Sequence, residues 1–385
     1  MKRPLDSLKV LDFSTLLPGP FATMMLADLG ADVVRVEAPD RPDWVRMLPP
    51  FDGDVSAWHA LLNRNKRSLA INLKQPGAIQ VIHRLVQTYD IVVEQFRPGV
   101  MDRLGIGYAS LSATNPRLIY CAITGYGQSG PYRDRAGHDI NYLALAGVMS
   151  HTGRKESGPA GMGLQVADVG GGSFGAIAGI LAAVIQRQLT GEGQLVDISM
   201  ADMALAWNSL AASQWLVGSE LAGYEAGPLN GGGPYDYYRT KDGRYLSVGS
   251  LEPKFWQGFC EAIGRPDLVE AGAEVKAEVA EAIASRKLTE WVDVFGPLDA
   301  CVEPVLTVEE ALGHPQTTAR GMVVDVPKPD GAMQRQVASP FRFSGSQAQY
   351  RHIGVSVGHD TEAVLAEIDY GAEEIASLIE RGIVH

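Results

Sequence analysis

The first 130 residues alternate short apolar runs with stretches of helical periodicity. Helical spacing of apolar positions extends over residues 18–29, after a Pro-Gly-Pro turn, and over 76–88. Apolar runs rich in β-branched residues predict strands at residues 8–13, 31–36, 69–73, 91–93 and 118–123. Strands that alternate with helices of this length predict an α/β domain with a parallel sheet covered on both faces.

The second half of the chain has a different pattern. Residues 174–188 predict a buried helix, with an apolar face and a stripe of small residues that admits a neighbouring helix. A short strand at 195–199 and a helical stretch at 201–217 follow. A glycine-rich turn then precedes a hairpin with strands near 235–239 and 244–248. The apolar face comprises Phe174, Ile177, Leu181, Val184 and Ile185, and the stripe comprises Gly175, Gly179 and Ala183.

This change divides the chain into a large domain over residues 1–200, a helical linker over 201–224 and a small domain over 225–334. At 385 residues the chain is long enough for two cores. Hydrophobic residues make up 46% and charged residues 20%, as is usual for globular proteins.

The formal net charge of -12 disfavours a nucleic-acid partner, which requires a basic surface. Any anionic ligand must therefore be held by a local group of cations. Three scattered cysteines favour a reducing compartment, and no histidine pair has metal-site spacing, so we expect no metal ion. The N-terminus lacks a signal-like apolar segment, and the longest apolar stretch, 174–185, is too short for a bilayer. We expect a cytoplasmic protein with no membrane partner.

Two segments of the sequence are candidates for ligand binding. The sequence Gly125-Tyr126-Gly127-Gln128-Ser129-Gly130 fits the dinucleotide pattern, but a loop composition follows it where a helix is required, so a glycine-rich loop at a cleft is favoured. The segment Asn63-Arg64-Asn65-Lys66-Arg67 concentrates three cations. With Arg35 and Arg97, which follow or end strands, it predicts phosphate contacts at the sheet edge, against the alternative of a solvated charged face.

His138 and Asp139 precede a helical stretch, and Asp168 precedes another and is followed by three glycines. An imidazole and carboxylates at helix starts can move a proton at neutral pH. Each also has a plain structural interpretation, since aspartate is a common helix cap. Glu252 taken alone resembles a surface residue.

The ordered set of motifs resembles the class III CoA-transferase superfamily, and more narrowly its α-methylacyl-CoA racemase branch. The resemblance runs nearly from end to end of the chain. It rests on residues 30–37, 63–73, 96–104 (FRPGVMDRL), 124–131 (TGYGQSGP), 137–142 (GHDINY), Asp168 with its glycines, 249–255 (GSLEPKF), 301–306, 314–315 and 319–321.

This resemblance implies a Rossmann-like large domain completed by residues 335–385, a small α+β domain and an interlocked homodimer. It implies that CoA lies on the large domain as part of an acyl-CoA substrate, with no separate cofactor. Tyr126 and Gly127 join Arg35, Asn63, Arg64, Lys66, Arg67 and Arg97 as expected CoA contacts. In the racemase branch His138 and Asp168 match the proton-transfer residues, and Glu252 matches the carboxylate that orients the histidine.

Two activities stay open at Asp139. In transferases of this superfamily it matches the nucleophilic aspartate, which would form an anhydride with an acyl-CoA and then a CoA thioester. In racemases it matches a helix-start residue whose backbone amide faces the thioester oxygen. Racemisation of 2-methylacyl-CoA thioesters through an enolate is preferred, because a transferase leaves His138, Asp168 and Glu252 without a role. A non-catalytic CoA-binding protein is disfavoured, because no titratable member of the set is missing.

Overall fold

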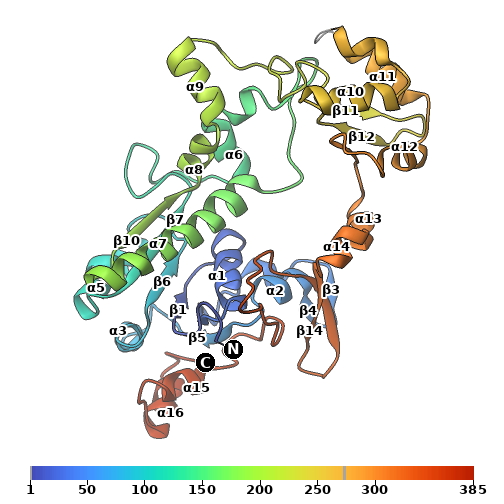
Figure 1. The fold of residues 1–385 in the computed structure, drawn as a ribbon. Helices are drawn as coiled ribbons and strands as arrows, with labels where there is room; N and C mark the ends of the chain where they lie inside the picture. The colour runs from blue at the N-terminus through green and yellow to red at the C-terminus, as the bar shows by residue number, and fades with distance from the viewer. Residues whose placement is uncertain (1, 272–274) are drawn as a thin grey trace. The chain divides into compact units, whose positions relative to one another are not determined.

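The computed structural model describes residues 2–271 and 275–385, and the largest sheet in it has six strands, all parallel (Figure 1). Its strand order is β10-β7-β6-β1-β2-β5. The strands are β1 (Lys9–Asp12), β2 (Asp32–Glu37), β5 (Arg67–Ala70), β6 (Ile91–Glu94), β7 (Ile119–Thr124) and β10 (Leu195–Ser199). The α/β class predicted from the sequence is confirmed.

Neighbouring residues along each strand enter different cores. Val10 and Val33 pack on the face covered by α1 (Pro18–Asp28) and α7 (Gly175–Thr190). Leu11 and Val34 pack on the opposite face, with α3 (Ala78–Val86) and with the C-terminal helices α15 (Thr361–Ala366) and α16 (Ala372–Glu380). Because side chains alternate between the faces of a strand, both faces of a doubly covered sheet must be apolar. This explains the nearly continuous apolar runs in the sequence.

The chain divides into two compact units. The first comprises Met1–Leu145, Gly163–Ala206 and Ala319–His385, and the second comprises Ala146–Met162 and Trp207–Thr318. The second unit contains a three-stranded antiparallel sheet and its own core, in which Phe259, Trp291 and Phe295 are buried. The expected hairpin is present in it as β11 (Asp236–Arg239) and β12 (Tyr245–Val248), and β13 (Val302–Pro304) completes the sheet.

These boundaries differ from the predicted ones in two places. The chain returns to the first unit at residue 319 rather than 335, because the ribbon of β14 (Val323–Pro327) and β15 (Met333–Val337) packs Val326 against Ala60 and Ile353. Residues 146–162 belong to the second unit, where Arg154 forms an ion pair with Asp236. Local sequence patterns cannot reveal either long-range contact.

The predicted helix at 174–188 is longer and less buried than expected. A π-helix, η3 (Val166–Phe174), precedes α7 directly. Ile177 and Val184 are buried against the sheet, whereas Ile185, expected on the apolar face, is 60% exposed. The small-residue stripe admits a strand as well as a helix: a Cβ on Gly179 would lie 2.7 Å from Val196 of β10, and one on Gly175 would lie 3.4 Å from Met203 of α8 (Met200–Trp207).

The run Val166–Thr190 is long and apolar enough to cross a membrane by length and composition alone. Half of its most apolar window is buried inside the fold, as in the core helices of many soluble proteins, so this single run is weak evidence for a span.

Candidate active site

A pocket lies where the order of the parallel strands reverses. From β1 the chain adds β2 and β5 on one side and β6, β7 and β10 on the other. Ligands of open α/β sheets bind outside the carboxyl ends of the strands at such a switch point. A cavity of about 290 Å³ occupies this place, lined by the loops that follow β1, β6 and β7. Its lining includes Leu16, Leu17, Pro18, Gln95, Phe96, Thr124 and Tyr126.

His138 and Asp168 both line this pocket. His138 is exposed just before α6 (Asp139–Leu145), and its backbone N–H donates to Asn141 Oδ1 at 3.0 Å. Tyr142 of α6 packs against two glycines: a Cβ on Gly125 or Gly137 would lie within 2.6 Å of its ring. These glycines therefore let the glycine-rich loop and the histidine loop approach each other closely.

Asp168 lies in the first turn of η3 and is half-buried. Burial raises the pKa of its carboxyl to about 6, the charge of Asp139 adds to the rise, and His138 opposes it. A carboxyl with this pKa is present in both protonation states near neutral pH. Such a group can serve either as a general acid or as a general base.

Asp139 occupies a different position from its two neighbours in the site. It is buried, only 7% exposed, and it does not line the pocket. Its Oδ1 accepts hydrogen bonds from the backbone N–H groups of Ala167, at 2.6 Å, and Asp168, at 3.0 Å. The carboxylate is thus directed at the start of η3 rather than at the cavity.

Three exposed arginines, Arg97, Arg133 and Arg135, line the pocket. Arg97 is among the predicted phosphate contacts. Arg133 and Arg135 were missed, although both lie between Gly130 and Gly137, in a loop that follows a strand. In a chain of net charge -12, these arginines form the local group of cations that an anionic ligand requires.

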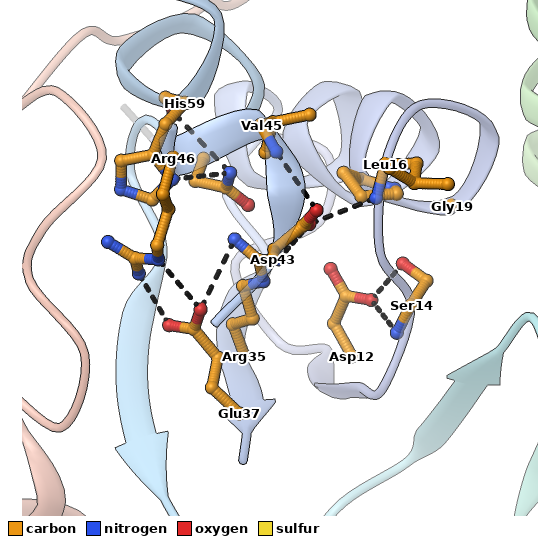
Figure 2. Close-up of polar contacts among 12 residues, drawn as sticks. Asp12, Ser14, Leu16, Gly19, Arg35, Glu37, Asp43, Val45, Arg46 and His59 are labelled. Atoms are coloured by element: carbon orange, nitrogen blue, oxygen red, sulfur yellow. Dashed lines mark hydrogen bonds and ion pairs between the residues drawn. The ribbon is translucent and has the colours of Figure 1, made fainter. Parts of the chain in front are cut away.

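Arg35 is buried and paired with carboxylates instead of exposed at the sheet edge, so its predicted phosphate contact is not supported by its position. Its side chain is 2% exposed and forms ion pairs with Asp43 and Glu37 (Figure 2). Asp43 also accepts the backbone N–H of Leu16 at 2.9 Å. Arg35 therefore stabilises the β1–α1 loop from inside the protein, behind the pocket wall.

The predicted cluster at residues 63–67 also requires correction. Asn63, Arg64 and Lys66 are at most 2% exposed, and their polar groups are already occupied. Arg64 pairs with Asp28, Lys66 pairs with Asp12, and Asn63 contacts Lys66 and His59. Arg67 is partly exposed but pairs with Asp32 and Glu367. The three cations of the cluster thus stabilise the fold through ion pairs, and none of them is free to bind a phosphate.

The remaining three predicted site residues are Tyr126, Gly127 and Glu252, and only the first of them lines the pocket. Tyr126 lines the pocket, and its ring meets Tyr132 and Tyr142 edge-on. Gly127 is buried, and its N–H donates to the Thr124 hydroxyl at 2.9 Å, so this N–H is engaged within the turn. Glu252 is exposed at the start of α10 (Pro253–Ala262) in the second unit, and its part in the reaction stays a prediction.

The profile of CoA-transferase family III matches residues 5–361. The chain belongs to this family. It is 35% identical to the alpha-methylacyl-CoA racemase of Homo sapiens, over 97% of this chain and 96% of that protein. It is also 31% identical to the human succinyl-CoA:glutarate CoA-transferase, over 99% of this chain and 90% of the relative.

Solved structures agree with this membership. A CAIB/BAIF family protein from Brucella suis superposes with a TM-score of 0.83 at 29% identity, covering 96% of this chain and all of that one. The family is an enzyme family, and its members named here are a racemase and a CoA-transferase of CoA thioesters. Both resemble this chain to similar degrees, so sequence identity does not separate the two activities. The choice between the two activities has to come from the site.

Proposed function

We propose that this protein is an α-methylacyl-CoA racemase, which interconverts the (R) and (S) forms of 2-methylacyl-CoA thioesters. One observation carries the proposal: His138 and Asp168 line the pocket, whereas Asp139 does not. A racemase needs two titratable groups at its substrate. A transferase of this family needs its aspartate there as a nucleophile, and the Asp139 carboxylate is buried with one oxygen bonded to two amides.

The proposed reaction transfers a proton from one face of the α-carbon to the other. One of His138 and Asp168 removes the α-proton, and the electrons of the C–H bond move into the thioester carbonyl to form an enolate. The other residue, in its protonated form, then donates a proton to the opposite face. The family resemblance implies that the negative thioester oxygen is stabilised by the backbone N–H of Asp139, which follows the pocket residue His138 at the start of α6. No cofactor is required beyond the CoA of the substrate.

Proton NMR in D₂O tests this proposal directly. With one enantiomer of a 2-methylacyl-CoA, we expect the α-proton to be replaced by deuterium while the other enantiomer accumulates. Addition of free carboxylic acids such as succinate should give no new CoA thioester. Transfer of CoA to the acid without α-deuteration would contradict racemisation and support the transferase.

We propose that Arg97, Arg133 and Arg135 bind the CoA phosphates in place of the buried cluster. Arg97→Ala is expected to raise the KM for acyl-CoA by about 10-fold, as loss of one charge-assisted hydrogen bond predicts, with little change in kcat. The effect should weaken at high salt, which screens exposed charges. Arg117→Ala is a matched control, because Arg117 is exposed before the amino end of β7 and bonds Gly191. An equal change in the control would contradict the assignment.

We also propose that the protein is an interlocked homodimer, as the family resemblance implies. The outward face of α7 supports this proposal. Ile185 and Leu189 are 60% and 83% exposed there, and Ala178 and Ala182 continue the same exposed row. Apolar rows of this kind commonly mark protein interfaces. Light scattering should give twice the chain mass of 41.3 kDa, and a stable monomer at micromolar concentration would contradict the proposal.

A further inference from the structure

Asp139 at the start of α6 forms hydrogen bonds with two residues that lie 28 and 29 positions later in the sequence. Its Oδ1 accepts the N–H groups of Ala167 and Asp168 at the start of η3. The first N–H groups of a helix have no partner within the helix. Gln165, the residue that precedes η3, provides no side-chain cap. Asp139 supplies from α6 the cap that the local sequence lacks.

An aspartate cap stabilises a helix start in two ways. Its oxygen satisfies the free N–H groups, and its negative charge favours the positive end of the helix dipole. In this protein the capped segment contains Asp168, which lines the pocket. A shift of the first turn of η3 would move the Asp168 carboxyl relative to the substrate, and small misplacements of catalytic groups are costly.

We infer that Asp139 acts through its side chain as a positioning residue, which fixes Asp168 at the pocket and places a negative charge beside it. The inference rests on the proposed racemase function, and it assigns to the Asp139 side chain a role other than that of a nucleophile. The two effects are separable, because asparagine retains an oxygen that accepts the amides but has no charge.

Among the described residues, the titratable groups coupled to Asp168 are Asp139, His138 and Tyr142, all from the region of α6. The exposed Arg97, Arg133 and Arg135 line the same pocket. Burial, followed by the charge of Asp168, raises the pKa of Tyr142, so this phenol stays neutral. The charged residues on the other elements around η3 are engaged elsewhere or exposed. Asp28 of α1 pairs with Arg64, and Arg187 of α7 pairs with Asp90. Asp197 of β10 accepts a hydrogen bond from the Gln128 N–H, and Asp202 of α8 (Met200–Trp207) is exposed.

The direction of the charge effect follows from these neighbours. Burial makes the largest contribution to the raised pKa of Asp168, about 6, and the charge of Asp139 raises it further. As a base Asp168 must be ionised, so deuterium exchange from the enantiomer that it deprotonates should rise as pH increases through about 6. Without the charge on Asp139 the pKa of Asp168 falls, and the rise should occur at lower pH.

The test compares Asp139→Asn with Asp139→Ala in the exchange assay, across pH and for each enantiomer. Asp139→Asn is expected to shift the rise to lower pH and to retain partial exchange at high pH, because asparagine keeps an oxygen that accepts the two amides. Asp139→Ala loses the cap as well, so its kcat should fall by roughly 10- to 100-fold with little change in KM. Asp202→Asn removes an exposed charge of α8 that does not line the pocket and should leave the pH profile unchanged.

Thermal unfolding shows whether each variant is folded at the assay temperature. Folded Asp139→Asn and Asp139→Ala proteins with unchanged rates and pH profiles would overturn the positioning role and leave the racemase proposal intact. A folded Asp139→Asn protein that exchanges no deuterium from either enantiomer would also overturn it. If wild-type protein transferred CoA to an added acid and this variant did not, Asp139 would be a nucleophile and the racemase proposal would fail too.

Discussion

Alanine in place of His138 is expected to stop α-proton removal from one enantiomer of a 2-methylacyl-CoA and to spare it in the other. Asp168→Ala should give the reverse pattern, because each base serves one face of the planar enolate. For the affected enantiomer we expect exchange to fall by roughly 10²- to 10⁴-fold, the usual contribution of a positioned acid or base. Separate D₂O exchange rates for the (R) and (S) thioesters provide the measurement.

Complete racemisation needs both residues, so either variant should lose it even where exchange persists. His83→Ala offers a control, because His83 lies on α3 and its ring contacts Thr114, away from the pocket residues. Full exchange from both enantiomers in a folded His138→Ala protein would exclude the two-base mechanism. Equal loss for both enantiomers in each variant would also argue against separate faces.

Replacement of Arg64 by alanine is expected to lower the free energy of unfolding by about 3–5 kcal/mol, the cost of breaking a buried ion pair. Arg64 is fully buried, bonds Asp28 through Nε and Nη2, and donates from Nη1 to Gln336 and to the Val337 carbonyl at 2.7 Å. The alanine variant leaves each of these groups without its partner. Urea unfolding midpoints at constant m-value would measure the loss.

The effect should depend on pH in a defined direction. Burial already raises the pKa of Asp28 above its ordinary value of 3.8, and without Arg64 the pKa rises further. A group whose pKa is higher in the folded state stabilises the fold at low pH, and this contribution is lost as pH rises. Arg64→Ala should therefore be more destabilised at pH 8 than at pH 5.

Two controls make the Arg64 experiment specific. Arg117→Ala, at an exposed site, should change stability by no more than about 0.5 kcal/mol. The double variant Asp28→Asn/Arg64→Met removes the unpaired charge together with its partner and should recover part of the loss. An Arg64→Ala midpoint equal to that of the unaltered protein would mean that the buried pair contributes nothing to stability.

Strands and their class were predictable because the information is local. Val10, Val33 and Ile91 fill one core while Leu11, Val34 and Val92 fill the other, and both sets appear as β-branched or apolar runs in the sequence. The exposed outer face of α7 was not predictable, since Ile185 has the same apolar character as the buried Ile177. Whether an apolar face of a helix is buried depends on which other segments pack against it, and the sequence of the helix does not contain that information.

The site shows the same division between local and distant information. His138 and Asp168 stood out by residue type and by position before helices, and the structure brings both to one pocket. The cations at 63–67 stood out equally, but their partners lie far away in sequence: Gln336, for example, is 272 residues from Arg64. Whether a basic cluster faces a ligand or an interior carboxylate depends on contacts that no local motif encodes.

The return of the chain to the first unit constrains the order of folding during synthesis. Leu365, Leu378 and Val384 belong to the same core as Leu11 and Val34, so this core, which α3 covers early, is complete only after residues 364–384 have been synthesised. Domains usually fold as their residues emerge. Here the second unit, which lies mostly within Trp207–Thr318, can complete its core before the unit that begins the chain. We therefore expect the earliest strands to reach their final packing later than the middle of the chain.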